Sequence, residues 1–110
     1  MPQRPFKPSP PLLNLFGDTP LVRVVDFFLT FQEFDYSKSQ VATEADVSRI
    51  TVDKIWPRLT KAGIIIRTRT VGNANLYKLN ASNPRVQALI EMDLKLSGAA
   101  AREQLVAAEA

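Results

Sequence analysis

The chain has 110 residues, which is enough for one domain with its own hydrophobic core. It contains no cysteine and no histidine, so disulfides, thiol nucleophiles, the usual metal ligands and catalytic pairs that need histidine are excluded. No apolar run reaches the roughly 18 residues that a membrane helix needs, and the first residues lack the apolar segment of a signal peptide. We therefore expect a soluble, cytoplasmic protein that is not an enzyme and holds no metal or cofactor.

Positive charge is concentrated in the middle of the chain. The formal net charge is only +3, but residues 49–78 hold seven cations and one anion. The remaining residues hold seven cations and ten anions. This distribution indicates a surface that faces a polyanion, although an ordinary solvated helix and strand would carry the same charges. Charge alone leaves both interpretations open.

The N-terminal segment, residues 1–13, contains five of the eight prolines. Because proline fixes φ and lacks an N–H, we predict a flexible, extended arm here that becomes ordered from about Leu12. The first helix is predicted to begin after Asp18 or Thr19, either of which can cap it. Its apolar residues recur at helical spacing on more than one side, and it is expected to end near residues 31–32.

Two shorter helices are predicted next. Ser37 is expected to cap one that runs to about residue 45, and Ser48 to cap one that runs to about residue 62, before Gly63. Pro57 lies inside the second of these and should kink it, because it removes one backbone hydrogen bond. The aromatic segment 34–36 is expected to form a brief edge strand.

A β-hairpin and a last helix complete the chain. Residues 64–70 are rich in β-branched side chains, residues 71–75 have turn chemistry and residues 76–79 form the return strand. Simple alternation places Arg67 and Arg69 on the same strand face. Asn83 and the proline after it are expected to start the last helix, which Ser97 and the glycine after it would interrupt.

This order of elements predicts a mainly α-helical protein with a small β-hairpin, an α+β class. Two short capped helices followed by a basic hairpin are the layout of a winged helix-turn-helix, here with an extra C-terminal helix. We expect residues 1–13 to form the arm, residues 14–82 the winged helix-turn-helix domain and residues 83–110 the C-terminal helix.

Residues 41–55 carry the most specific pattern. Ala42 is small enough for two helices to approach, and Asp46 tolerates the left-handed backbone that the turn between them needs. The turn is then followed by an apolar plug, a helix cap and residues that seat the second helix: Val47, Ser48, Val52 and Ile55. With Leu59, Gly63 and the hairpin, this pattern resembles the winged helix-turn-helix transcription regulators of the MarR and ArsR group, in particular small archaeal single-domain members. The resemblance covers about residues 15–96, and the family usually has glycine where this chain has Asp46.

The resemblance implies binding to double-stranded DNA, with residues 48–62 in the major groove and the hairpin, residues 64–79, on the adjacent backbone or minor groove. Arg49 is the first candidate for reading guanine, whereas Asp53 is expected to pair with Arg49 or Lys54 or to accept from cytosine. The candidate DNA-binding residues are Ser37, Lys38, Gln40, Ser48, Arg49, Thr51, Val52, Lys54, Arg58, Lys61, Arg67, Arg69, Asn73 and Asn75.

The last helix has more apolar residues than a fold of this size can cover, which predicts a homodimer. The alternative is that this helix completes the core of a single chain. The candidate dimer residues are Leu12, Leu13, Phe16, Val86, Leu89, Ile90, Leu94, Leu96 and Leu105. No small-molecule effector is evident, and any effector would have to bind at the dimer interface.

The leading interpretation is therefore a dimeric, sequence-specific, nucleoid-associated DNA-binding regulator. One alternative is a winged-helix module that binds another protein in a larger assembly, and the basic third helix and hairpin argue against it. Another is a non-specific architectural DNA-binding protein, which the small net charge disfavours.

Overall fold

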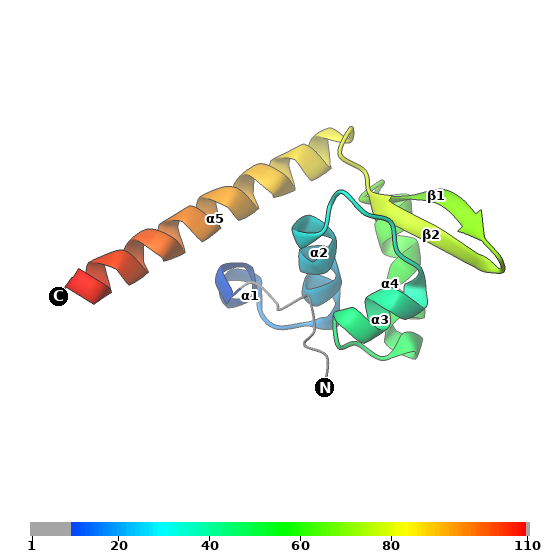
Figure 1. Cartoon of the computed structure of the whole chain (residues 1–110), viewed down its shortest axis with the longest axis horizontal. Helices are drawn as coiled ribbons and strands as arrows, with labels where there is room; N and C mark the ends of the chain where they lie inside the picture. The colour runs from blue at the N-terminus through cyan, green and yellow to red at the C-terminus, as the bar shows by residue number, and fades with distance from the viewer. Residues whose placement is uncertain (1–9, 110) are drawn as a thin grey trace.

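The structure, a computed structural model, describes residues 10–109 and the side chains of residues 12–98. Helices and a single hairpin follow one another along this part of the chain (Figure 1): α1 (Pro10–Phe16), α2 (Pro20–Thr30), α3 (Lys38–Glu44), α4 (Arg49–Lys61), β1 (Ile65–Val71), β2 (Ala74–Leu79) and α5 (Pro84–Glu109). The two strands are antiparallel. The predicted α+β class and the order of the predicted elements are confirmed.

Helix α1 lies partly within the segment that was predicted to be an extended arm. That prediction is wrong from Pro10 onward, because proline is tolerated in the first turn of a helix, where N–H groups have no intrahelical partner. Leu12 is buried in the core, and Gly17, with φ at 94°, ends the helix by donating its N–H to the Leu13 carbonyl at 2.7 Å. The rest of the predicted arm, residues 1–9, lies outside the described residues.

Helix α2 is the centre of the core. Thr19 caps it, accepting from the N–H of Val22 at 3.3 Å. Phe27 and Phe28 are buried on different sides of the helix: Phe27 packs edge-on against Tyr36 with ring centroids 4.8 Å apart, and Phe28 lies 5.9 Å from Trp56 of α4. The prediction that this helix is buried on more than one side is confirmed.

The turn between α3 and α4 has the predicted chemistry. Ser37 and Ser48 cap the two helices through their hydroxyl oxygens. Asp46 has φ at 57°, the only non-glycine residue with positive φ among the described residues, and the Val47 N–H then donates to the Ala42 carbonyl at 3.0 Å. Ala42 and Ala45 are buried between the helices. Together these features fix how α3 and α4 meet.

Two predicted irregularities of the helices have different outcomes. Helix α4 continues through Pro57, and the Thr60 hydroxyl donates to the carbonyls of Trp56 and Pro57 at 3.3 and 3.2 Å. The kink at Pro57 stays a prediction. Helix α5 is continuous through Ser97, so the predicted interruption there is wrong. In the described part of the chain, no helix combines the length and the apolar character needed to cross a membrane.

The hairpin is tighter than its sequence predicts. Val71 pairs with Ala74 across a two-residue turn in which Gly72 has φ at 59°. The register shifts between Arg67 and Arg69, which leaves Thr68 as the extra residue of a β-bulge. The predicted edge strand is confirmed as a bridge between Tyr36 and Tyr77, whose N–H groups each donate to the other's carbonyl at 2.8 Å.

The bulge is held by Asp35. The Thr68 hydroxyl and the Arg69 Nε donate to its Oδ2 at 2.6 and 3.0 Å. Two consecutive side chains that reach one carboxylate lie on the same side of the strand, so Arg67 faces the other way. The prediction that Arg67 and Arg69 share a face is therefore wrong, because the bulge interrupts the alternation.

Asn83 joins the end of α4 to the start of α5. Its Nδ2 donates to the Ala62 and Gly63 carbonyls at 3.2 and 2.8 Å, and its Oδ1 accepts from the Arg85 N–H at 2.9 Å, which confirms the predicted cap. Gly63 has φ at 72°, and a Cβ there would lie 2.7 Å from the Asn83 Nδ2. From this junction α5 extends away from the hairpin (Figure 1).

We expect Asn83→Ala to lower the free energy of unfolding by about 1–3 kcal/mol, because it removes the cap of α5 and leaves carbonyls at the end of α4 with fewer donors. Urea denaturation followed by circular dichroism measures this change. Asn14→Ala, at an exposed position of α1, is the control and should have little effect. Equal midpoints for the two variants would contradict the role assigned to Asn83.

The contact of Asp35 with the hairpin predicts a pH dependence. Hydrogen bonding by Arg69, and then by Thr68, lowers the pKa of Asp35. A carboxyl whose pKa is lowered by folding stabilises the fold above its unfolded pKa, near pH 4, and this contribution is lost as the pH falls through the folded value. Asp35→Asn should therefore lower the Tm at pH 7, and the difference from wild type should shrink below about pH 4.

Glu91→Gln is the matched control, since Glu91 forms an exposed ion pair with Lys95 at 3.0 Å within α5. Its Tm should stay close to that of wild type at pH 7. A Tm difference for Asp35→Asn that is the same at pH 7 and pH 3 would show that the charge of Asp35 does not stabilise the hairpin.

Candidate nucleic-acid interface

Helix α4 has one apolar face and one basic face. Val52, Trp56 and Leu59 point into the core, at positions that repeat every three or four residues. The opposite face is exposed and consists mainly of charged residues: Arg49, Ile50, Asp53, Lys54, Arg58 and Lys61. Val52 was predicted both to seat the helix and to contact DNA. It is 0% exposed, so the second of these predictions is wrong.

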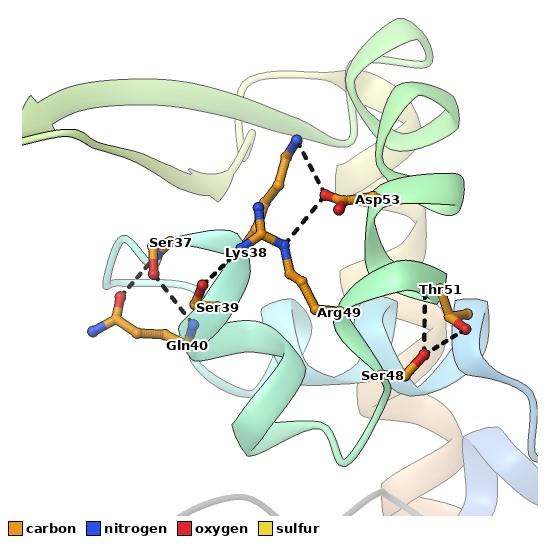
Figure 2. Close-up of polar contacts among 8 residues, drawn as sticks. All are labelled: Ser37, Lys38, Ser39, Gln40, Ser48, Arg49, Thr51 and Asp53. Carbon is orange, nitrogen blue, oxygen red and sulfur yellow. Dashed lines mark hydrogen bonds and ion pairs between the residues drawn. The ribbon is translucent and has the colours of Figure 1, made fainter.

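The N-terminal turn of α4 is bound to α3 through polar side chains (Figure 2). Arg49 donates from Nη1 to Ser39 Oγ at 2.7 Å and from Nε to Asp53 Oδ1 at 3.2 Å. Lys38 Nζ lies 3.6 Å from the same Asp53 oxygen. The predicted pairing of Asp53 with Arg49 is confirmed, and the sequence did not indicate the contacts of Lys38 or Ser39, because they depend on how α3 and α4 are packed.

This ion-pair group leaves its cations accessible. The side chains of Arg49 and Asp53 are about half exposed, at 50% and 48%. An exposed pair of this kind typically contributes less than about 1 kcal/mol and is screened by salt. Lys38 also lies 5.9 Å from the ring centroid of Trp56, which fixes its stem against the core. Arg49 is therefore oriented by its neighbours but is free to exchange them for another acceptor.

Several predicted polar residues act as helix caps. The Ser37 hydroxyl accepts from the Gln40 N–H at 3.2 Å, while Gln40 Oε1 accepts from the Ser37 N–H at 2.8 Å. The Ser48 hydroxyl accepts from the Thr51 N–H at 3.2 Å and donates to the Thr51 hydroxyl at 2.8 Å. These four side chains set the positions of the two helix N-termini, and Gln40 and Ser48 are also exposed.

A cleft of about 510 Å³ lies between the helices and the tip of the hairpin. It brings together five of the predicted residues, from α3, α4 and the hairpin: Ser37, Lys38, Arg49, Asn73 and Asn75. Its lining also includes Ser39, Val71, Ala74 and Tyr77, which sequence reasoning did not assign to an interface. The remaining predicted cations are exposed outside it, on α4 and β1: Lys54, Arg58, Lys61, Arg67 and Arg69.

The predicted dimer residues fall into three groups. Leu12 and Val86, at 3% and 0% exposed, are covered by this chain's own core, so their assignment to a dimer interface is wrong. Four residues are half-buried, of which the last three pack against the core: Leu13, Leu89, Ile90 and Leu96. Phe16 and Leu94 are exposed, at 53% and 68%, as is Leu15, which was not predicted. Leu105 lies outside the residues whose side chains are described.

No protein-family model matches the chain. No curated protein sequence matches it either. Solved structures do match: NadR in complex with 4-hydroxyphenylacetate has a TM-score of 0.60 at 22% identity, covering 86% of this chain and 68% of NadR. Ligand-free NadR has a TM-score of 0.55 at 24% identity, covering 86% and 67%.

A mutant of Lactococcus lactis ZitR, in its apo form, has a TM-score of 0.65 at 13% identity, and covers 89% of this chain and 74% of its own. NadR and ZitR are winged-helix transcription regulators of the MarR type. At these identities the likeness is one of fold. The chain therefore has the winged-helix fold that NadR and ZitR share.

Proposed function

We propose that this protein is a transcription regulator that binds double-stranded DNA with α4 in the major groove. The observation that carries the proposal is the exposed basic face of α4, whose N-terminal turn opens into the cleft beside the hairpin tip. Helices of this kind contact base edges with their N-terminal residues. The same fold in NadR and ZitR supports this placement.

Arg49 is the residue proposed to read a base. Its guanidinium has the geometry to donate to O6 and N7 of guanine together, once Ser39 and Asp53 are exchanged for the base. Three further cations of the α4 face are proposed to contact phosphates: Lys54, Arg58 and Lys61. Such contacts set affinity without reading sequence.

The hairpin and α3 supply the remaining contacts of the proposal. Asn73, at the tip, and Arg67 would lie along the backbone or minor groove next to the one that α4 enters. Lys38 and Ser37 are at the N-terminus of α3, across the cleft from the tip. Arg69 stays bound to Asp35 and contributes mainly to the position of the hairpin.

Sequence-specific binding is favoured over architectural binding by Asp53. A carboxylate on the basic face repels phosphates, which lowers the affinity for DNA of any sequence. The same carboxylate holds Arg49 at 3.2 Å, so the cation is already near the position from which it would read a base. Asp53 therefore lowers the affinity for a preferred site less than it lowers the affinity for DNA of other sequences.

We further propose a homodimer. Two copies place two α4 helices in successive major-groove turns, about 34 Å apart, which doubles the DNA contacts. The surface proposed for this contact lies on α1 and α5, which pack together and expose Phe16 and Leu94. In Figure 1, α1 and the C-terminal part of α5 lie away from the hairpin, so a contact there would leave the hairpin accessible. The protein would then act on chromosomal DNA in the cytoplasm.

A small-molecule effector is compatible with the proposed function. NadR has been solved with 4-hydroxyphenylacetate bound, so a protein of this fold can bind a small carboxylic acid. The prediction that no effector is evident therefore has no support from the proteins of similar fold.

Arg49→Ala should weaken binding to a preferred duplex by about 5- to 150-fold, because one bidentate base contact contributes about 1–3 kcal/mol. Fluorescence anisotropy with a duplex selected from a random library, at several salt concentrations, measures the loss. Arg85→Ala removes an exposed arginine at the start of α5 and should change affinity less than twofold. The absence of salt-dependent binding to any duplex would contradict the proposed function.

Leu94→Glu should convert a dimer into a monomer, because it places a charge in the proposed apolar contact. Sedimentation velocity reads the change in mass directly. Thr43→Glu adds the same charge at an exposed position of α3 and should leave the mass unchanged. If the wild-type protein sediments with the mass of one chain at all concentrations, the proposed homodimer is wrong. DNA binding is tested separately by the anisotropy measurement.

A further inference from the structure

An apolar side chain stands among the charged residues of the α4 face. Ile50 is 70% exposed, the highest value among the large apolar side chains that the structure describes. It is the second residue of α4, directly after Arg49 and next to Thr51. Helical spacing places Ile50 on the side of α4 opposite Val52, and the structure shows its side chain in solvent.

The fold provides no reason for this exposed isoleucine. The core contacts of α4 come from Val52, Trp56 and Leu59, on the opposite face. Isoleucine is a weaker helix former than alanine, lysine or glutamine, so helix propensity does not favour it either. Its neighbours four and eight residues on, Lys54 and Arg58, are exposed cations on the same side of the helix.

The major groove of B-DNA contains one apolar group, the C5-methyl of thymine. Phosphates and most base edges are polar. Removing an isoleucine side chain from water in the groove is therefore favourable only where it packs against such a methyl group or a sugar. Val52, the apolar residue that was predicted to reach the groove, is buried. Thr51 is half-buried, and its hydroxyl accepts from that of Ser48 at 2.8 Å, so Ile50 is the more exposed apolar group of this helical turn.

We propose that Ile50 contacts the C5-methyl group of a thymine next to the base that Arg49 reads, and so determines a preference for thymine at that position. This inference depends on the proposed placement of α4 in the major groove. Two residues of the same helical turn would then determine sequence preference through different chemistry. Ile50 would pack against a methyl group, whereas Arg49 would donate hydrogen bonds to base acceptors.

The test replaces single thymines by deoxyuridine in a duplex selected for tight binding. This change removes only the methyl group and keeps the Watson–Crick pairing. For the wild-type protein, one position in each half-site should bind about fourfold more weakly as deoxyuridine, the ratio expected for one buried methyl group. For Ile50→Ala, the duplex with thymine should itself bind more weakly, and the ratio at that position should fall towards one.

Phe34→Ala is the matched control, since Phe34 is 59% exposed but lies outside α4. It should keep the full ratio of thymine to deoxyuridine. Because Ile50 is so exposed, Ile50→Ala should keep the wild-type Tm and circular dichroism spectrum. If Ile50→Ala changes the Tm or the spectrum, Ile50→Val replaces it. The ratio of the affinities for thymine and deoxyuridine should then lie between the ratios of wild type and of Ile50→Ala.

The outcomes separate the two proposals. Salt-dependent binding in which no thymine responds to deoxyuridine would overturn the role of Ile50 and leave the DNA-binding function intact. A response that Ile50→Ala does not reduce would assign the methyl contact to another residue and also overturn it. No binding to any duplex would overturn the proposed function itself.

Discussion

The candidate interface depends on how closely α3 passes α4, and that distance is set by the turn between them. Asp46 takes a left-handed backbone, and the small residues Ala42 and Ala45 leave room for the contact. Only because the helices meet here can Ser39 of α3 accept a hydrogen bond from Arg49 of α4 at 2.7 Å. The turn therefore also positions the polar group at the interface.

The basic surface is balanced by its own anions. Asp53 lies between Lys38 and Arg49, and Asp35 holds Arg69 on the hairpin, so the cations are already oriented in the free protein. The Arg49–Asp53 pair is about half exposed and therefore weak, so another acceptor can replace Asp53 at little cost, whereas Asp35 is only 18% exposed and keeps Arg69 on the hairpin. The anions among these cations therefore keep defined side-chain positions on the basic surface.

Features that depend on a few neighbouring residues were predictable from the sequence, and features that depend on distant contacts were not. The caps at Ser37 and Ser48 are local, since each hydroxyl bonds an N–H three residues on. The bulge at Thr68 was missed because its partner, Asp35, is 33 residues away in the chain. Val52 was correctly predicted to seat α4, but the sequence did not show that its burial prevents a contact with DNA. Prolines at the start of α1 were taken for helix breakers, although the first turn accepts them.

The junction at Asn83 has a mechanical consequence. The Asn83 side chain binds the carbonyls of Ala62 and Gly63, just after α4, and the first N–H of α5, so it links the ends of the two helices. Because α5 has 26 residues, a small rotation about its N-terminal end would displace its C-terminal end by a large distance. Any tilt of α5 relative to the core must either move the C-terminal end of α4 with it or break hydrogen bonds of Asn83. The orientation of α4 is therefore linked, through Asn83, to the angle of α5.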